Sequence, residues 1–317
     1  MNVIHWDGLS PAPQTIQNHV VTIGNFDGVH QGHAALLRRL NDRQKLMQLP
    51  GMVITFDPPP IKVLKPDYSL EQLTTLDERI QLIRQFNIES ILVLKTSPHL
   101  LELSAWGFWN ELLVLQLQIR GMVEGRNFCF GKDRQGAVEH LEKWCNNIKV
   151  PLDIVDDIYQ DGTKISSSVI RQALKQGNIP VANQALARTY SLYGTVVHGD
   201  HRGSKIGFPT GNLANIQTLI PRDGVYACLA QCEGNAWPAA VNIGPNPTFG
   251  VMHRKVEAHL LGFQGDLYGK TITLQFIARL RDTQPFASLQ ALQSQLQRDI
   301  QQVDKIVKRS TGTVSSC

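Results

Sequence analysis

The sequence predicts an α/β domain built on a parallel sheet, followed by an antiparallel β-barrel domain with a C-terminal helix. The chain has 317 residues, which exceeds the usual size of one domain and favours two domains of roughly 150 residues each. Its first half alternates short apolar runs with segments of helical periodicity, whereas its second half has short β-rich runs separated by turns that contain Gly, Pro or Asn. The change falls near residues 180–188, so we expect domains over residues 1–186 and 187–309 and a flexible tail over residues 310–317.

In the first half, five apolar runs predict strands and the segments between them predict helices. The strands are expected at Val20–Ile23, Met52–Phe56, Ile91–Leu94, Gly121–Val123 and Leu152–Val155. The helices are expected at Ala34–Met47, Leu76–Phe86, Ala105–Leu117 and Ser166–Lys175. Such alternation is typical of a parallel sheet with helices on both faces. Gly177 and Pro180 then predict a stop at the end of the domain.

In the second half, the β-rich runs predict an antiparallel barrel or sandwich. The strands are expected at Gly194–His198, Val225–Ala230, Ala239–Ile243, Lys255–Leu261 and Thr271–Leu280. The segment Ser288–Lys308 predicts one helix that covers a side of the barrel. Its apolar stripe consists of Leu289, Leu292, Leu296, Ile300 and Val303.

The composition excludes several classes of protein. With 42% hydrophobic and 18% charged residues, the chain is too apolar to be largely disordered. No apolar stretch approaches the ~20 residues that span a bilayer, and Met1–Ser10 lacks the pattern of a secretion signal, so we expect a cytoplasmic protein without a membrane partner. The five cysteines form no C-x-x-C framework, which favours free thiols over disulfides or structural zinc.

The charge balance points to small anionic ligands. Lys and Arg number 31 and Asp and Glu number 27, which leaves a net charge of +4 spread along the chain. This balance suits anionic small molecules but falls short of a nucleic-acid footprint, so we expect no nucleic-acid partner. The sequence leaves the oligomeric state undetermined.

The most informative motif is the segment Gly24–His33, between the first predicted strand and its helix. A helix start presents unpaired N–H groups and positive partial charge, and the glycines of this segment permit close approach of a phosphate. His30 and His33 are three residues apart, which directs both imidazoles toward one phosphate-sized space. A capping or packing role for the pair is the alternative; a metal pair would need a third ligand, and none is placed nearby.

A second motif occupies Ile165–Arg171, at the start of a predicted helix. Ser167 and Ser168 can cap the helix and donate hydroxyl hydrogen bonds, while Arg171 can offer a planar fork to a triphosphate. An ordinary helix cap is the alternative.

Together these motifs resemble those of nucleotidyltransferases. The first is similar to their H-x-G-H signature in the form G-x-F-D-G-x-H-x-G-H, and the second to I-S-S-T-x-I-R, with Ser168 in place of threonine. Thr55–Pro60 resembles a T-F-D-P-x-P loop and Gly125–Lys132 resembles G-x-D-F-x-F-G-K, where Asn127 replaces the commoner aspartate. This combination resembles the bacterial bifunctional riboflavin kinase/FAD synthetase family.

The second half carries the other part of that resemblance. His198–Asn212 is similar to the flavokinase segment H-G-x-x-x-G-x-x-L-G-F-P-T-A-N, with Gly211 in place of alanine. The further flavokinase motifs follow in order at Gly224–Ala227, Asn242–Gly244, Pro247–Phe249, Glu257–Leu261 and Leu267–Lys270.

The resemblance implies two reactions on one chain. A riboflavin kinase domain would phosphorylate riboflavin to FMN with Mg²⁺ and ATP, and a Rossmann-like nucleotidyltransferase domain would adenylylate FMN to FAD with release of pyrophosphate. It also implies that His30 and His33 stabilise charge on the phosphates and that Glu257 is the base for the riboflavin hydroxyl. Strand alternation places Glu257 and His259 on the face opposite Val256.

The remaining implied site residues bind nucleotide, flavin or Mg²⁺. In the first domain they are Gly24, Phe26, Asp27, Gly28, Gly32, Asn127, Ser167, Ser168 and Arg171. In the second they are Gly199, Gly203, Lys205, Gly207, Pro209, Thr210 and Asn212. Thr210 and Asn212 offer the small oxygen ligands that magnesium accepts.

Two other functions remain open at the level of the sequence. The barrel could be a flavin-sensing module attached to a working adenylyltransferase, although the complete Pro-Thr-x-Asn and Glu257 set argues against it. Alternatively, the first domain could transfer a nucleotide to another phosphorylated acceptor, which the flavokinase half disfavours.

Overall fold

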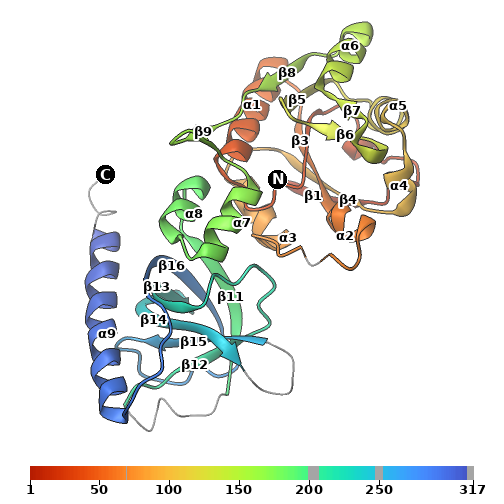
Figure 1. Cartoon of the computed structure of the whole chain (residues 1–317). Helices are drawn as coiled ribbons and strands as arrows, with labels where there is room; N and C mark the ends of the chain where they lie inside the picture. The colour runs from red at the N-terminus through yellow and green to blue at the C-terminus, as the bar shows by residue number, and fades with distance from the viewer. Residues whose placement is uncertain (69, 199–206, 247–252, 313–317) are drawn as a thin grey trace. The chain divides into compact units, whose positions relative to one another are not determined.

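The computed structural model describes residues 1–68, 70–198, 207–246 and 253–312 of the chain (Figure 1). The chain forms two compact units, residues 1–167 and 168–317. The domain boundary expected at residue 186 stays a prediction.

The first unit is built on a six-stranded parallel sheet, as the sequence predicts. Its strand order is β1-β4-β3-β2-β5-β8. These strands are β1 (Asn2–Trp6), β2 (Val20–Ile23), β3 (Gly51–Asp57), β4 (Ser90–Lys95), β5 (Gly121–Gly125) and β8 (Leu152–Val155). The sequence did not predict β1, which lies at the edge of the sheet and pairs with β4.

Helices cover both faces of this sheet (Figure 1). On one face, α1 (Gln31–Met47) and α3 (Leu76–Arg84) contribute to an apolar cluster with the strands. On the other, a cluster includes residues of α4 (Pro98–Glu102), η2 (Phe108–Gln116) and α6 (Val138–Ile148). The helix predicted over Ala105–Leu117 is instead a short α5 (Ala105–Gly107) that continues into the π-helical η2. The shorter elements are η1 (Gln14–Ile16), α2 (Pro60–Leu64), β6 (Cys129–Phe130), η3 (Lys132–Arg134), β7 (Gly136–Ala137), β9 (Tyr159–Gln160) and β10 (Thr163–Lys164).

The second unit contains a closed antiparallel barrel, again as predicted. Its strands follow the order β11-β12-β15-β14-β13-β16. They are β11 (Tyr190–Val197), β12 (Gly211–Ala214), β13 (Gly224–Cys232), β14 (Asn235–Asn246), β15 (His253–Leu260) and β16 (Thr271–Arg281). The sequence did not predict β12, because its residues fall inside a segment rich in glycine and proline.

The C-terminal helix α9 (Leu289–Gly312) packs against the barrel, as expected. Val303 and Val307 are buried and form a cluster with Ala227 of β13. Leu289, which the sequence placed on the apolar stripe, is exposed. The helix continues to Gly312, past the expected end at Lys308.

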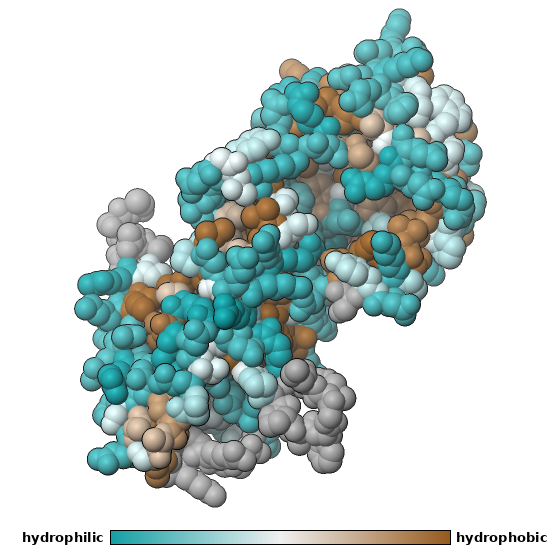
Figure 2. All heavy atoms as spheres, viewed as in Figure 1, coloured by the Kyte–Doolittle hydropathy of each residue, from teal (hydrophilic) through white to brown (hydrophobic). Residues whose placement is uncertain are grey.

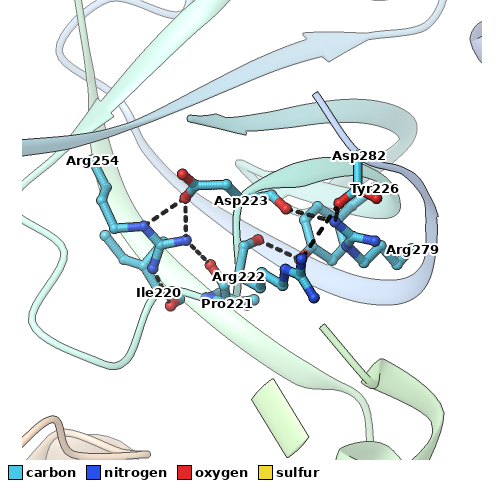
Figure 3. A network of polar contacts seen from close by, with 8 residues as sticks. All are labelled: Ile220, Pro221, Arg222, Asp223, Tyr226, Arg254, Arg279 and Asp282. Atoms are coloured by element: carbon cyan, nitrogen blue, oxygen red, sulfur yellow. Dashed lines mark hydrogen bonds and ion pairs between the residues drawn. The ribbon is translucent and has the colours of Figure 1, made fainter. Parts of the chain in front are cut away.

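A polar network surrounds residues 220–223, the segment that precedes β13, and Figure 3 shows its members. Helix α7 (Ser167–Gln176) contacts the same segment. The backbone N–H of Arg222 donates to the Leu174 carbonyl of α7 at 2.9 Å. Arg254, at the start of β15, donates to the Asp223 carboxylate at 2.6 and 2.8 Å and to the Ile220 carbonyl at 2.7 Å. These bonds fix the beginning of the strand that carries Glu257.

Helix α8 (Ile179–Leu186) also packs on the barrel. The Asn183 amide donates to the Phe276 carbonyl at 2.8 Å and accepts from the Tyr190 backbone N–H at 2.8 Å. Asn183 therefore bridges β16 and β11, the two strands against which the helix packs.

We expect a barrel fragment that begins at residue 178 to be more stable than one that begins at residue 187. The shorter fragment loses both Asn183 hydrogen bonds and the burial of α8. Since each such bond contributes about 1 kcal/mol, the thermal midpoint should fall by about 5 °C or more. Circular dichroism during heating measures this difference. Equal midpoints would show that α8 contributes nothing to the barrel.

Hydrophilic residues cover most of the face drawn in Figure 2, and hydrophobic residues show in small separate areas. The exposed large hydrophobic side chains belong to different elements, such as Leu46 of α1 and Leu115 of η2. Within the described ranges, no helix is both long enough and apolar enough to cross a membrane.

Candidate functional site

In the first unit, the loop after β2 lies where the strand order of the sheet reverses. β2 has β3 on one side and β5 on the other, and the chain reaches β3 first. In open α/β sheets, ligands bind outside the carboxyl ends of the strands at such a switch point. The loop Gly24–His30 leaves this end of β2 and leads directly into the 17-residue helix α1. Its position is therefore that of a ligand-binding loop.

The backbone of this loop is unusual. Phe26, Gly28 and Val29 have positive φ values of 48°, 83° and 38°. Val29 is β-branched, and for such a residue this conformation is strained. Left-handed residues next to a helix N-terminus are typical of anion-binding loops. The loop therefore has the backbone form that a phosphate site requires.

The structure brings His30 and His33 together. Their rings stack with centroids 3.7 Å apart, and the ring of Phe26 lies 5.1 Å from that of His33. His30 is also the N-cap of α1, because its Nδ1 accepts from the His33 backbone N–H at 3.3 Å. A Cβ on Gly32 would lie 3.1 Å from the His30 ring, so a glycine here gives that ring room. His30 therefore caps α1, and the shared phosphate-facing position of the two imidazoles stays a prediction.

Asp27 anchors the loop from within the unit. Its buried carboxylate accepts from the backbone N–H groups of Leu73 and Thr74 at 3.0 and 3.1 Å, and from the Thr74 hydroxyl at 3.2 Å. The Thr74 hydroxyl in turn accepts from the Gly28 N–H at 3.0 Å. Gly24 is held by a bond from its N–H to the Ile54 carbonyl at 3.0 Å. Asp27 therefore acts as a structural support of the loop.

The second predicted motif is joined to this loop through Ser167. Its hydroxyl donates to the Asp27 carbonyl at 2.8 Å. Ser168 is exposed and Arg171 half-buried on the first turns of α7, in the second unit. Their roles as nucleotide ligands stay predictions.

Two buried ionisable residues near the loop were not predicted. Arg79 of α3 is 1% exposed, and its Nη1 donates to the Thr55 hydroxyl at 3.2 Å. Burial lowers the pKa of Arg79, while the charges of Asp27 and Asp57 oppose that shift. The spacing Leu76, Arg79, Ile80 and Ile83 puts Arg79 on the apolar face of its helix, and this was the signal in the sequence.

The other is Glu124 of β5, which is 1% exposed. Its Oε1 accepts from the Ile23 backbone N–H at 2.7 Å. Burial raises the pKa of the Glu124 carboxyl well above its usual range, and the bond from Ile23 only partly opposes this. A glutamate directly after the predicted apolar strand Gly121–Val123 was the signal in the sequence.

In the second unit, the predicted base lies beside the predicted magnesium ligand. Glu257 of β15 and Asn212 of β12 are paired across the two strands. Glu257 Oε1 lies 2.9 Å from Lys255 Nζ, and the Asn242 amide donates to its Oε2 at 3.4 Å. Val256 is buried on the opposite face, which confirms the predicted alternation.

Other predicted residues of this site lie at the end of the same strands. A ring nitrogen of His259 is 2.7 Å from the Pro209 carbonyl oxygen. Thr210 is half-buried, and Gly207 lies in a turn with φ of 88°. The predicted residues Gly199, Gly203 and Lys205, and the motif Pro247–Phe249, lie outside the described residues.

Comparisons with known proteins match the two halves of the chain to two different enzyme families. A family model described as FAD synthetase matches residues 12–169, and one described as riboflavin kinase matches residues 186–307. A relative from Escherichia coli (strain K12), named bifunctional riboflavin kinase/FMN adenylyltransferase, is 36% identical over 292 residues, which cover 92% of this chain and 93% of the relative. The chain belongs to the bifunctional riboflavin kinase/FMN adenylyltransferase family.

Further relatives span most of the chain. A protein of the same name from Pseudomonas fluorescens is 34% identical over 288 residues, covering 89% of this chain and 90% of that protein. A solved structure described as a macrolide-efflux protein from Streptococcus pneumoniae is 30% identical with a TM-score of 0.86, and covers 95% of this chain and 98% of that chain. That solved chain shares the fold described above.

Two departures from the family motifs have local partners in this riboflavin kinase/FMN adenylyltransferase family member. The Asn127 amide donates to Asp157 at 2.6 Å, and Lys164 pairs with the same carboxylate at 2.8 Å. An aspartate at position 127 would instead oppose a like charge. At Gly211, a Cβ would lie 2.8 Å from a methyl carbon of Val196, so glycine fits this packing without a shift.

Proposed function

We propose that the second unit phosphorylates riboflavin to FMN and that the first unit adenylylates FMN to FAD, with ATP as the donor in both reactions. The observation that carries the proposal is that the residues proposed to act on the phosphates lie together in the first unit, and that the proposed base lies beside the proposed magnesium ligand in the second. The stacked pair His30 and His33 lies at the N-terminus of α1, and Glu257 lies opposite Asn212 in the barrel.

In the proposed adenylyl transfer, a phosphate oxygen of FMN attacks the α-phosphorus of ATP and the bond to pyrophosphate breaks. The reaction needs no covalent enzyme intermediate. His30 and His33 stabilise the negative charge that develops on the phosphates, and the N-terminus of α1 adds positive partial charge. Ser167, Ser168 and Arg171 support the nucleotide, and Asn127 has a flavin-side role.

In the proposed phosphoryl transfer, the 5′-hydroxyl oxygen of riboflavin attacks the γ-phosphorus of ATP and ADP leaves. Glu257 accepts the proton of that hydroxyl. Lys255 and Asn242 each contact one carboxylate oxygen, which orients the group.

The barrel residues fit a magnesium ion. Asn212 Oδ1 is buried and has no hydrogen-bond partner in the described part of the chain. Thr210 lies two residues earlier and supplies a hydroxyl. Hard oxygen donors of this kind suit Mg²⁺, which neutralises triphosphate charge when bound. Thr210 and Asn212 would hold the ion together with the nucleotide.

The two reactions differ in their co-products, which provides a test. With riboflavin as the acceptor, phosphorus NMR should detect ADP first; with FMN as the acceptor, it should detect pyrophosphate and no ADP. Pyrophosphate without FAD would show that the adenylyl group passes to water as AMP, or to another acceptor, and not to FMN. ADP formation with ATP and FMN, in the absence of riboflavin, would contradict the separation of the two reactions.

A further inference from the structure

The carboxyl of Glu124 occupies a gap between two strands of the first sheet. β2 and β5 are paired only at Val20 with Gly121 and at Val21 with Met122. Beyond these pairs, the backbone N–H of Ile23 finds its acceptor in the Glu124 side chain at 2.7 Å. A side chain therefore replaces a backbone carbonyl at the point where the two strands separate.

This gap lies at the switch point of the sheet, next to the predicted phosphate loop. Ile23 directly precedes Gly24, the first residue of the loop. On its other side, the backbone of Glu124 is paired with Ile154 of β8. Glu124 thus connects β2 to the β5–β8 pair, three residues before Asn127, for which a flavin-side role is proposed.

The burial of this group argues against an incidental surface contact. Glu124 is 1% exposed, and alternation places its side chain on the same face as Met122, which belongs to the large apolar cluster. Burial of a carboxyl group costs free energy unless hydrogen bonds in the protein offset the loss of hydration. Ile23 is itself buried, so its N–H would have no access to water if the carboxyl were removed.

We propose that Glu124 is a positioning residue for adenylyl transfer, which holds the end of β2, and with it the loop Gly24–His30, against β5. The inference rests on the proposed function of the first unit. Glu124 touches no reacting atom in this scheme; it acts through Ile23 and the loop.

The test compares three full-length variants in FAD formation from FMN. Glu124→Met keeps the size but removes the acceptor, and should raise the KM for ATP about 10-fold, because the backbone N–H groups of the loop bind phosphate in the ground state and the transition state alike. Displacement of His30 at the end of the loop should add a smaller loss in kcat. Glu124→Gln keeps an acceptor oxygen for the Ile23 N–H and should restore the KM to within about two-fold of the parent. Thr22→Val is the matched control, since it removes a buried hydroxyl that has no hydrogen-bond partner among the described residues, on the same strand.

The inference would be overturned if Glu124→Met had the parental KM for ATP. It would also be overturned if Glu124→Gln raised this KM as much as Glu124→Met does. If Glu124→Met fails to fold, Glu124→Asp replaces it, because the shorter side chain keeps the carboxyl but cannot reach Ile23, and the same rise in KM is expected. Riboflavin phosphorylation by each variant should stay at the parental rate. Absence of FAD formation in the parent protein would instead contradict the proposed function itself.

Discussion

Glu257→Gln should lower riboflavin phosphorylation by about 10²- to 10⁴-fold, the usual contribution of a general base. Glutamine keeps the size of the side chain and one acceptor oxygen, so Asn242 can still contact it, but it cannot accept the hydroxyl proton. The rate of FMN formation from riboflavin, measured by chromatography, tests this.

Glu233→Gln is a matched control for that variant. Glu233 is an exposed glutamate of the same unit and pairs with Lys270 at 2.8 Å, much as Glu257 pairs with Lys255 at 2.9 Å. It should leave phosphorylation unchanged. Adenylylation of supplied FMN should persist in both variants. A kinase rate within a few-fold of the parent in Glu257→Gln would exclude Glu257 as the base, whereas loss of both activities would indicate misfolding.

His33→Ala should lower FAD formation from FMN by about 10²-fold or more, the typical loss for one prepositioned donor. The variant separates catalysis from helix capping. The cap of α1 uses the backbone N–H of His33 and the ring of His30, and alanine keeps that N–H. Loss of activity in a folded variant therefore reports on the imidazole itself.

His99→Ala is the control for this second variant, because His99 is an exposed histidine of α4 in the same unit. It should form FAD at the parental rate. Riboflavin phosphorylation should be nearly unchanged in both. If His33→Ala formed FAD at the parental rate, the imidazole of His33 would have no catalytic role, and only the capping of α1 by His30 would remain.

Most of the fold follows from local pattern, and the exceptions have physical causes. Val20–Ile23 and Leu152–Val155 were predicted with the bounds that the structure has. Val20–Ile23 is buried throughout, and Leu152–Val155 keeps three apolar residues although it lies at the sheet edge and is largely half-buried. The strand β1 was missed because it lies at the sheet edge, where half-exposed and polar residues obscure the apolar pattern. Helix α8 was missed because Pro180 was interpreted as a breaker, although proline is tolerated in the first turn of a helix.

The site was less predictable than the fold, because its supports come from distant parts of the chain. The motifs located His30, His33 and Glu257, and the structure adds the contacts among their neighbours. Local sequence does not show that Asp27 would accept bonds from residues 73 and 74, or that Glu124 would bond to Ile23, 101 positions earlier. Such partners depend on which strands become neighbours, and that is a property of the whole sheet.

Chromatographic separation of riboflavin, FMN and FAD after incubation of the purified protein with riboflavin, ATP and Mg²⁺ tests most directly whether one chain performs both reactions. FMN should appear first and FAD should follow at its expense. A mixture of Glu257→Gln and His33→Ala should form FAD from riboflavin although neither variant alone does so efficiently, because FMN can pass from one protein to the other. Riboflavin that remains unchanged, or FMN that accumulates without any FAD, would contradict the assignment of two working sites.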